Sequence, residues 1–301
     1  MNPWAVDAGC PRSCAERAAV RVDAAEAARR YAALAREVGG ALALGERLAD
    51  GDTARARARR VLRALGVRLD AGPVPLRVPG GGAGTLVVAN HVSWLDVVAL
   101  LAVEPVAFVA KREVGRWPVV GTLARRLGTR FIDREGGRRE LPLMVRELAG
   151  TLADGHTVLV FPQATTWCSP SGGRFRRAVF QAALDAGVPV RPVTVTYRLG
   201  RAESTVPAFL GDEGFGASLG RVVSARGLSV RVEAHAPVHG ADRKELAQAA
   251  WAAVTGRSRT AVPRTRPVPL RAAALTEAGR GPWPAPAADP PARLVPDRRT
   301  G

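Results

Sequence analysis

The pattern of hydrophobic and polar positions changes near residue 70. Residues 15–66 are rich in Ala, Arg, Glu and Leu, which favour helix, and apolar side chains recur there at helical steps. Gly39 and Gly40 are expected to break or bend this helical stretch. From Pro73 onward, short β-rich runs alternate with stretches of helical length. This alternation predicts an α/β layer structure.

Each element of the second part is predicted from its length and side-chain types. Buried strands are expected at 85–89, 106–110, 129–132, 157–161, 190–197 and 228–234. Helices are expected at 95–103, 119–127, 138–152, 175–185 and 242–254. The chain therefore divides into an N-terminal helical segment (1–70), an α/β domain (71–256) and a Pro/Ala/Arg-rich tail (257–301). The tail cannot bury enough apolar surface to offset its ordering entropy, so it is expected to be disordered.

A basic stretch from Arg55 to Arg63 allows two interpretations. It could lie flat on anionic lipid, with the arginine stems reaching along the surface. Alternatively, it is a solvated helix packed on the main domain, which its lack of aromatic side chains favours. The formal net charge of +17 bears on the same question, because it attracts anionic lipid, nucleic acid or phosphate-bearing substrates. No recognised nucleic-acid module is found and aromatic residues are few, so nucleic acid is not expected as a partner.

The cysteine content and the lengths of the apolar runs limit the classes of protein that remain possible. Three cysteines, Cys10, Cys14 and Cys168, do not make a disulfide scaffold, and their spacing does not predict a metal site. No cofactor is expected. No apolar run reaches the roughly 18 residues that span a bilayer, and the N-terminus lacks the apolar core of a signal peptide. The expectation is a cytoplasmic protein, either free or lying on a membrane.

The strongest chemical signal is the segment Asn90-His91-Val92-Ser93-Trp94-Leu95-Asp96, which follows a strand and opens a helix. His91 can act as a general base near neutral pH, and Asp96 can fix its tautomer. Five residues of continuous helix turn through about 500°, so the two side chains meet only if His91 precedes the helix. Ser93 is a good N-cap and would supply that start. Asp96 could instead complete a capping box with Ser93, and its two oxygens allow both roles.

Four blocks in order resemble the lysophospholipid acyltransferase family, which includes the glycerol-3-phosphate and 1-acylglycerol-3-phosphate acyltransferases. The first is Asn-His-x4-Asp, and the second is Gly-x2-Phe-x2-Arg, ending here at Arg134. The family's third block, Phe-Pro-Glu-Gly-Thr, corresponds to Phe161, Pro162, Gln163, Ala164 and Thr165. The fourth is a Val-Pro-x-x-Pro strand at 188–192, and the resemblance covers about residues 60 to 255.

The resemblance implies a glycerolipid acyltransferase-like fold and an O-acyltransferase at the membrane. His91 would deprotonate an acceptor hydroxyl, which attacks the thioester of acyl-CoA or acyl carrier protein. The acceptor would be a lysophospholipid, with 1-acylglycerol 3-phosphate, giving phosphatidic acid, as the first candidate. Another lyso-lipid, such as a lyso-aminolipid, or lipid binding without turnover are the alternatives. The protein would lie peripherally on the cytoplasmic face of the cell membrane.

Substrate-binding residues are also implied by the resemblance. Arg134 would bind an acceptor phosphate, assisted by Lys111 and by Arg176 or Arg177. The third block would contribute to acceptor binding, but Gln163 and Ala164 replace the family's Glu and Gly. One hypothesis is that Gln163 weakens turnover on phosphatidate precursors, so that Gln163→Glu would raise it.

Overall fold

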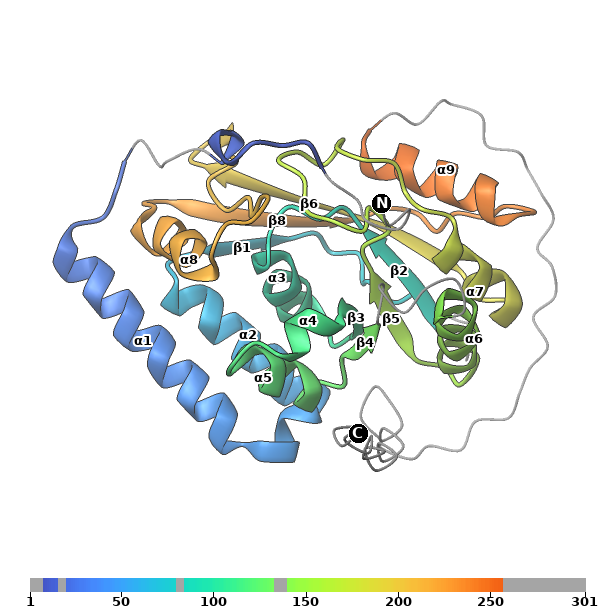
Figure 1. Cartoon of the computed structure of the whole chain (residues 1–301), viewed down its shortest axis with the longest axis horizontal. Helices are drawn as coiled ribbons and strands as arrows, with labels where there is room; N and C mark the ends of the chain where they lie inside the picture. The colour runs from blue at the N-terminus through green and yellow to red at the C-terminus, as the bar shows by residue number, and fades with distance from the viewer. Residues whose placement is uncertain (1–7, 16–19, 80–83, 133–139, 257–301) are drawn as a thin grey trace, which may run out of the picture.

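The computed structural model describes residues 8–15, 20–79, 84–132 and 140–256 (Figure 1). Its strands are β1 (Arg68–Ala71), β2 (Thr85–Ala89), β3 (Ala107–Lys111), β4 (Arg130–Ile132), β5 (Thr157–Val160), β6 (Val190–Leu199), β7 (Ala202–Glu203) and β8 (Leu228–Ala234). Its α-helices are α1 (Ala24–Ala43), α2 (Gly51–Ala64), α3 (Leu95–Val103), α4 (Arg112–Gly115), α5 (Val120–Arg126), α6 (Glu140–Ala153), α7 (Ala178–Ala186), α8 (Phe215–Ser224) and α9 (Arg243–Val254). Short 3-10 helices lie at Arg12–Cys14 (η1) and Gly45–Ala49 (η2).

The described strands form one mixed sheet in the order β1-β8-β6-β2-β5-β3-β4, with β7 paired to β6. β2 lies near the middle and runs parallel to both neighbours, β5 and β6. β6 and β8 are antiparallel, while β1 is parallel to β8. This confirms the α/β class and the mixed sheet flanked by helices. A loop that follows β2 therefore emerges at the carboxyl edge of a parallel region, where α/β proteins commonly bind ligands.

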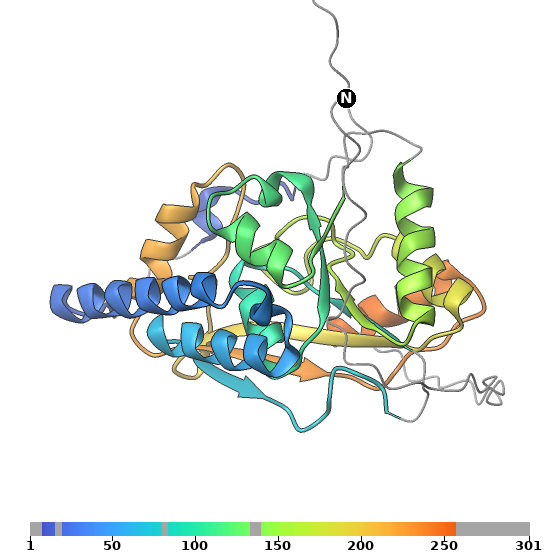
Figure 2. The same cartoon turned by 90° about the horizontal axis from the view of Figure 1, so that it is seen from below.

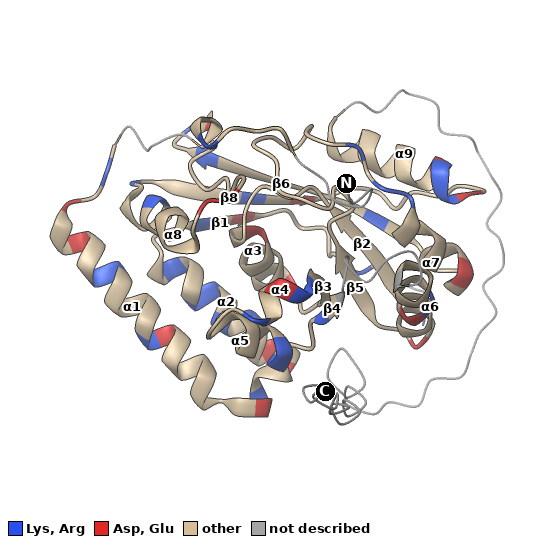
Figure 3. Cartoon of the chain, viewed as in Figure 1, with Lys and Arg blue, Asp and Glu red and all other residues tan. Residues whose placement is uncertain are grey.

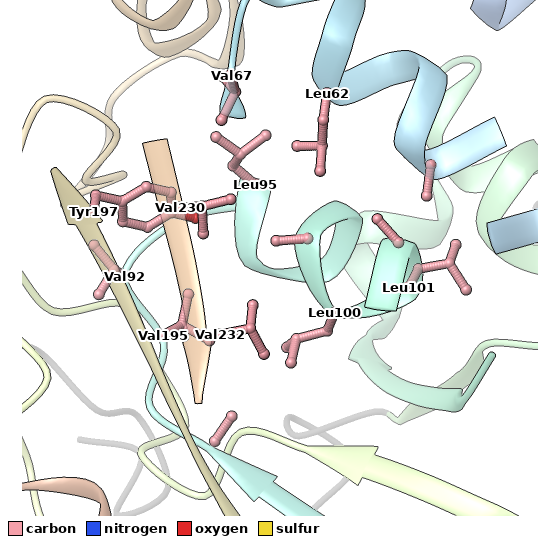
Figure 4. Packing of buried hydrophobic residues seen from close by; sticks show 14 of the residues in the cluster. Leu62, Val67, Val92, Leu95, Leu100, Leu101, Val195, Tyr197, Val230 and Val232 are labelled. Carbon is pink, nitrogen blue, oxygen red and sulfur yellow. The ribbon is translucent and has the colours of Figure 1, made fainter. Parts of the chain in front are cut away.

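Alternate residues of the strands bury themselves in two cores on opposite faces of the sheet. Val87 and Ala89 of β2 face the cluster that includes α2, α3 and α8, whereas Leu86 and Val88 face α6, α7 and α9. Figure 4 shows α3 between the sheet and α2 in the first of these cores. All five residues of β2 are buried, so the strand that leads to the Asn-His-x4-Asp block is held on every side.

The N-terminal helices begin at aspartate caps. The side chain of Asp23 accepts from the backbone of Glu26, and Asp50 caps α2 in the same way. α1 runs along one side of the molecule and extends beyond α2 (Figure 2). The expected break at Gly39 and Gly40 is wrong, because α1 continues through both to Ala43. Tertiary packing explains this.

The packing at Gly40 is a close approach by the neighbouring helix. A Cβ at Gly40 would lie 2.7 Å from a guanidinium nitrogen of Arg57, which pairs with Glu37. A larger residue at Gly40 would displace the end of the Arg57 side chain from its pair with Glu37, so the glycine suits this contact between α1 and α2. At Gly39 an added Cβ would meet nothing within 4 Å.

α2 decides between the two interpretations of the basic stretch. Its apolar face, Ala54, Ala58 and Leu62, is buried against the main domain. Arg59 donates to the carbonyl of Ala102 in α3, which ties the two helices together. Figure 3 shows the basic positions of α2 along the ribbon. The helix is thus packed on the domain and does not offer that apolar face to lipid.

The helices α4 and α8 and the strands β1 and β7 were not expected from the sequence. α8 has glycines inside it or at its N-cap, which lower intrinsic helix propensity, and β1 is a largely exposed edge strand without apolar alternation. The tail 257–301 lies outside the described residues, so its expected disorder stays a prediction. Within the described ranges no helix combines the length and apolarity needed to cross a bilayer.

Candidate active site

His91 and Asp96 meet in the turn between β2 and α3, as their spacing required. Nδ1 of His91 lies 2.8 Å from Oδ2 of Asp96. The same oxygen accepts from the backbone N–H groups of Val92 (2.7 Å) and Ser93 (2.9 Å). The other oxygen, Oδ1, accepts from the hydroxyl of Tyr197 at 2.5 Å. Asp96 is fully buried, so these four donors replace water around its charge.

The local turn explains why this geometry forms. The hydroxyl of Ser93 accepts from the backbone N–H of Leu95 at 3.2 Å, at the first residue of α3. The expected N-cap at Ser93 is one residue too early, because Trp94 is the N-cap of α3 and makes no side-chain cap bond. Asp96 nevertheless accepts from the N–H of Ser93, as the acid of a capping box does for its N-cap residue. The capping and the orienting roles therefore coexist on one carboxylate. His91 precedes the helix, and this lets it approach Asp96.

The imidazole of His91 is held on its face as well as at Nδ1. Its ring stacks on Phe161 with centroids 4.0 Å apart and planes 14° apart. The side chain keeps 21% of its surface exposed, while Asp96 has none. Because Nδ1 faces a carboxylate acceptor, the ring carries its proton there and Nε2 is the nitrogen left to accept a substrate proton.

Gln163 is buried and ties the third block to the histidine. Its Oε1 accepts from the backbone N–H of His91 at 2.7 Å. Its Nε2 faces three carbonyl oxygens, at 2.8 Å in Gly172, 3.2 Å in Gly173 and 3.4 Å in Pro170. The surroundings thus supply one donor and several acceptors. A carboxamide satisfies both sides, whereas an ionised carboxylate would satisfy only the first.

Two further loops are hydrogen-bonded to the same turn. The backbone N–H of Trp167 donates to the carbonyl of His91 at 2.8 Å, and that of Phe209 donates to the carbonyl of Val92 at 3.0 Å. The hydroxyl of Thr166 donates to the carbonyl of Phe209 and joins the two loops. The backbone on both sides of the histidine is therefore fixed by long-range bonds.

Ala164, at the position where the family usually has Gly, adopts φ +65°. This is the left-handed region, which costs an L-residue about 1–2 kcal/mol relative to Gly. The turn therefore has a positive φ, which favours glycine, at a position occupied by alanine. The strain sits beside Gln163, whose hydrogen bonds hold the turn in place.

The remaining predicted residues surround this centre or lie at the surface. Pro162 is buried and its carbonyl accepts from the backbone N–H of Arg176, at the start of the segment that leads into α7. Thr165 is half-buried. The cationic candidates Lys111, Arg176 and Arg177 are exposed. Arg134 lies outside the described residues. Phosphate binding by these four stays a prediction.

Tyr197 was missed by sequence reasoning. It lies on β6, and its hydroxyl donates to Asp96 from a fully buried position beside Val230 (Figure 4). Burial, followed by the charge of Asp96 and this hydrogen bond, raises the pKa of Tyr197 well above its ordinary value. The phenol therefore stays protonated and keeps donating. A polar-tipped aromatic near the end of an apolar strand was the only signal in the sequence.

Asn90 was predicted as part of the motif but without a role. Its side-chain amide donates to the carbonyl of Val195 (2.9 Å) and accepts from the N–H of the same residue (2.8 Å). The side chain thus extends the pairing of β2 with β6 by one step. Trp94 also has a defined place, because its indole N–H donates to the hydroxyl of Ser218 in α8.

Comparisons with known proteins agree with this geometry. The acyltransferase family model matches residues 72–196. A 1-acyl-sn-glycerol-3-phosphate acyltransferase of Neisseria meningitidis is 39% identical over 175 residues, 58% of this chain and 67% of the relative. A lyso-ornithine lipid O-acyltransferase of Pseudomonas aeruginosa is 37% identical over 217 residues, 71% of this chain and 83% of the relative.

A solved structure shares the fold. The 1-acyl-sn-glycerophosphate acyltransferase PlsC of Thermotoga maritima superimposes with a TM-score of 0.55 at 22% identity, over 79% of this chain and 97% of that one. Fold, motif order and relatives together define an O-acyltransferase of lysolipids. The chain belongs to the acyltransferase family of which these lysolipid enzymes are members.

Proposed function

We propose that this acyltransferase uses His91 as the general base and Asp96 as its positioning partner. The observation that carries the proposal is the 2.8 Å contact between Nδ1 of His91 and the buried carboxylate of Asp96. That contact fixes the tautomer in which Nε2 can take a proton. It also stabilises the imidazolium that forms when the proton arrives.

The reaction then proceeds by acyl transfer from a thioester, supplied as acyl-CoA or acyl carrier protein. The acceptor hydroxyl gives its proton to Nε2 of His91 while its oxygen bonds to the carbonyl carbon. The tetrahedral intermediate collapses and breaks the carbon–sulfur bond. His91 returns the proton to the departing thiolate, so the products are an ester and a free thiol.

For the acceptor we propose 1-acylglycerol 3-phosphate first, with phosphatidic acid as the product. The support is the 39% identical relative and a set of basic side chains that could meet a phosphate, Arg134, Lys111, Arg176 and Arg177. Lys111, Arg176 and Arg177 lie at the solvent-exposed surface. The remaining third-block residues, Phe161 to Thr165, would shape the acceptor side of the site.

A lyso-ornithine lipid is the second candidate acceptor. The alignment to the Pseudomonas aeruginosa enzyme is longer in both chains than the alignment to the Neisseria enzyme. An ornithine headgroup has no phosphate, so it would make the basic residues less important than His91. Comparing the two acceptors therefore tests the role of those residues as well.

We also propose that the protein works as a peripheral protein on the cytoplasmic face of the cell membrane. Its acceptor class resides in bilayers, and the net charge of +17 favours anionic lipid. Exposed apolar side chains, Val20, Tyr31, Val119 and Leu143, could contact the lipid interface. Binding to anionic vesicles that weakens with salt would support this placement, whereas equal binding to neutral vesicles would contradict the charge argument.

The decisive experiment offers acyl-CoA or acyl carrier protein with each lysolipid in vesicles and identifies products by mass spectrometry. His91→Ala should abolish the diacyl product, while His239→Ala, which alters an exposed histidine, should leave it unchanged. The acceptor with the higher kcat/KM is the assigned one. No product from either lysolipid with either donor, or full activity of His91→Ala, would overturn the proposal.

A further inference from the structure

The three cysteines of the chain converge on one place. The sequence holds only Cys10, Cys14 and Cys168, and all are free and half-buried. Sγ of Cys10 lies 3.6 Å from Sγ of Cys168, although 158 positions separate them in the sequence. Burial, followed by the neighbouring thiols of Cys10 and Cys14, raises the pKa of Cys168 to about 11. All the thiols of a long chain thus meet in one cluster.

This cluster joins the N-terminal segment to the loop that holds the catalytic turn. Cys168 follows Trp167, whose backbone N–H donates to the carbonyl of His91. Cys10 precedes the short 3-10 helix η1, and Cys14 is its last residue. Arg12 of the same helix forms an exposed ion pair with Asp212, and such a pair contributes little stability. Cys10, Cys14 and Ala15 of this segment also pack against the core.

We propose that Cys10 and Cys168 form a reversible disulfide when the protein meets a hydroperoxide. An S–S bond is about 2.05 Å long, so the two sulfur atoms must approach by roughly 1.5 Å from their present separation. Rotation of the two half-buried cysteine side chains can supply that movement. The inference is independent of the acyl-transfer function.

The two thiols take different roles in the oxidation. The raised pKa of Cys168 disfavours its thiolate, so Cys168 is assigned the second step and its neighbour Cys10 the first. The thiolate of Cys10 breaks the O–O bond of hydrogen peroxide and becomes a sulfenic acid, with one water released. The sulfur of Cys168 then displaces the second water. Two thiols lose two hydrogens and two electrons, and one peroxide becomes two waters.

Peptide mapping of the full chain tests the pairing directly. The purified reduced protein is treated with hydrogen peroxide, free thiols are alkylated, and the protein is digested with trypsin. Cleavage after Arg12 puts Cys10 and Cys14 in different peptides, and Cys168 falls in a third. The expected result is a linked peptide of Cys10 and Cys168, two hydrogens lighter than the separate peptides, which a thiol reductant removes.

Single variants and a denatured control make the result specific. Cys14→Ser should keep the linked peptide, whereas Cys10→Ser and Cys168→Ser should lose it. In denaturant the close pair Cys10 and Cys14 should link instead, because the shorter loop closes more readily. Oxidation should also raise the Tm of the native protein and of Cys14→Ser, and leave that of Cys168→Ser unchanged.

Two results would overturn the inference. One is that Cys10 and Cys168 are both still alkylated in native protein after a peroxide treatment that does oxidise the thiols of a denatured sample. The other is a native product that links Cys10 to Cys14 or joins two chains. Either would leave the three thiols as apolar packing against the core.

Discussion

Asp96 and Gln163 are two buried polar side chains that both hydrogen-bond to His91. The groups that surround them are of opposite kinds. Asp96 is met by four donors, from His91, Val92, Ser93 and Tyr197. Gln163 is met by one donor and three carbonyl acceptors. The first environment stabilises a negative charge and the second opposes one. The balance of donors and acceptors therefore explains why one position carries an acid and the other an amide.

The largest expected effect comes from neutralising the acid. Asp96→Asn keeps the shape of the side chain, but it removes the charge that stabilises the imidazolium of His91. We expect kcat to fall by about 10³–10⁴, the loss seen when a triad aspartate is replaced in this way. Steady-state kinetics on vesicles would measure this. Glu104→Gln is the matched control, because Glu104 also accepts from backbone N–H groups but does so at residues 76 and 77; a similar loss there would show that the effect is structural.

Adding a charge at the neutral position should harm the enzyme by a smaller factor. A carboxylate in Gln163→Glu would face the carbonyls of Gly172 and Gly173, which loosens the loop that fixes His91. We expect kcat to fall about 10–100-fold near pH 8, equivalent to roughly 1.4–2.7 kcal/mol. This is opposite to the expectation drawn from the family's usual Glu. Higher turnover in the variant would show that the amide of Gln163 lowers activity. It would contradict the view that the surroundings of Gln163 oppose a negative charge.

The pH dependence of the same variant separates charge from shape. Burial and the carbonyl oxygens should raise the pKa of the introduced acid, and protonation restores a hydrogen-bond donor. The ratio of variant to wild-type kcat should therefore rise as pH falls, and taking the ratio removes the protonation of His91 that both share. Gln248→Glu, on the exposed surface of α9, should give a flat ratio.

Removing one donor from Asp96 should have a moderate effect. Tyr197→Phe leaves the ring packed in the core but deprives Oδ1 of its partner. A hydrogen bond to a charged group contributes about 1.5–3 kcal/mol, so we expect unfolding free energy to drop by that amount. Its kcat should fall less than in Asp96→Asn. Denaturant unfolding and kinetics would measure both, with Tyr31→Phe, the other tyrosine, as the control.

The smallest effect is expected at the turn beside Gln163. Ala164→Gly removes a left-handed backbone cost of about 1–2 kcal/mol. It also increases the conformational entropy of the unfolded chain, which lowers stability by about 0.4–1 kcal/mol. The net gain should be about 0.5–1 kcal/mol of unfolding free energy, with kcat nearly unchanged. Denaturant melts would detect it. A loss of stability would show that the methyl group of Ala164 makes packing contacts that outweigh the backbone strain.

The sequence predicted those parts of the site that depend on near neighbours. Helical geometry correctly places His91 before the helix and Asp96 in its first turn, whereas the capping rules put the N-cap one residue early, at Ser93 instead of Trp94. The strand order could not be derived in the same way, since β6 pairs with β2 across about 100 residues. Tyr197 is the clearest example, because no local pattern states which buried carboxylate a distant hydroxyl will meet.

Two positions depend on contacts that the local sequence does not contain. Gly40 was expected to weaken α1, but the close approach of Arg57 makes a small residue favourable there. Gln163 was interpreted by comparison with the usual Glu, and the three carbonyls that face it come from residues 170–173. In each case a contact with another segment overrides the local preference. Propensity describes the segment alone and cannot include that partner.

The Asn90 side chain has a mechanical consequence. Its amide forms a pair of hydrogen bonds with Val195, as a peptide group in the next position of β2 would do. The pairing of β2 with β6 thus continues to the point where the backbone of β2 turns away towards His91. Separating the two strands at this end would break both hydrogen bonds together. A hinge motion of the turn that carries His91 would therefore have to break two hydrogen bonds at once, so this end of the sheet resists opening.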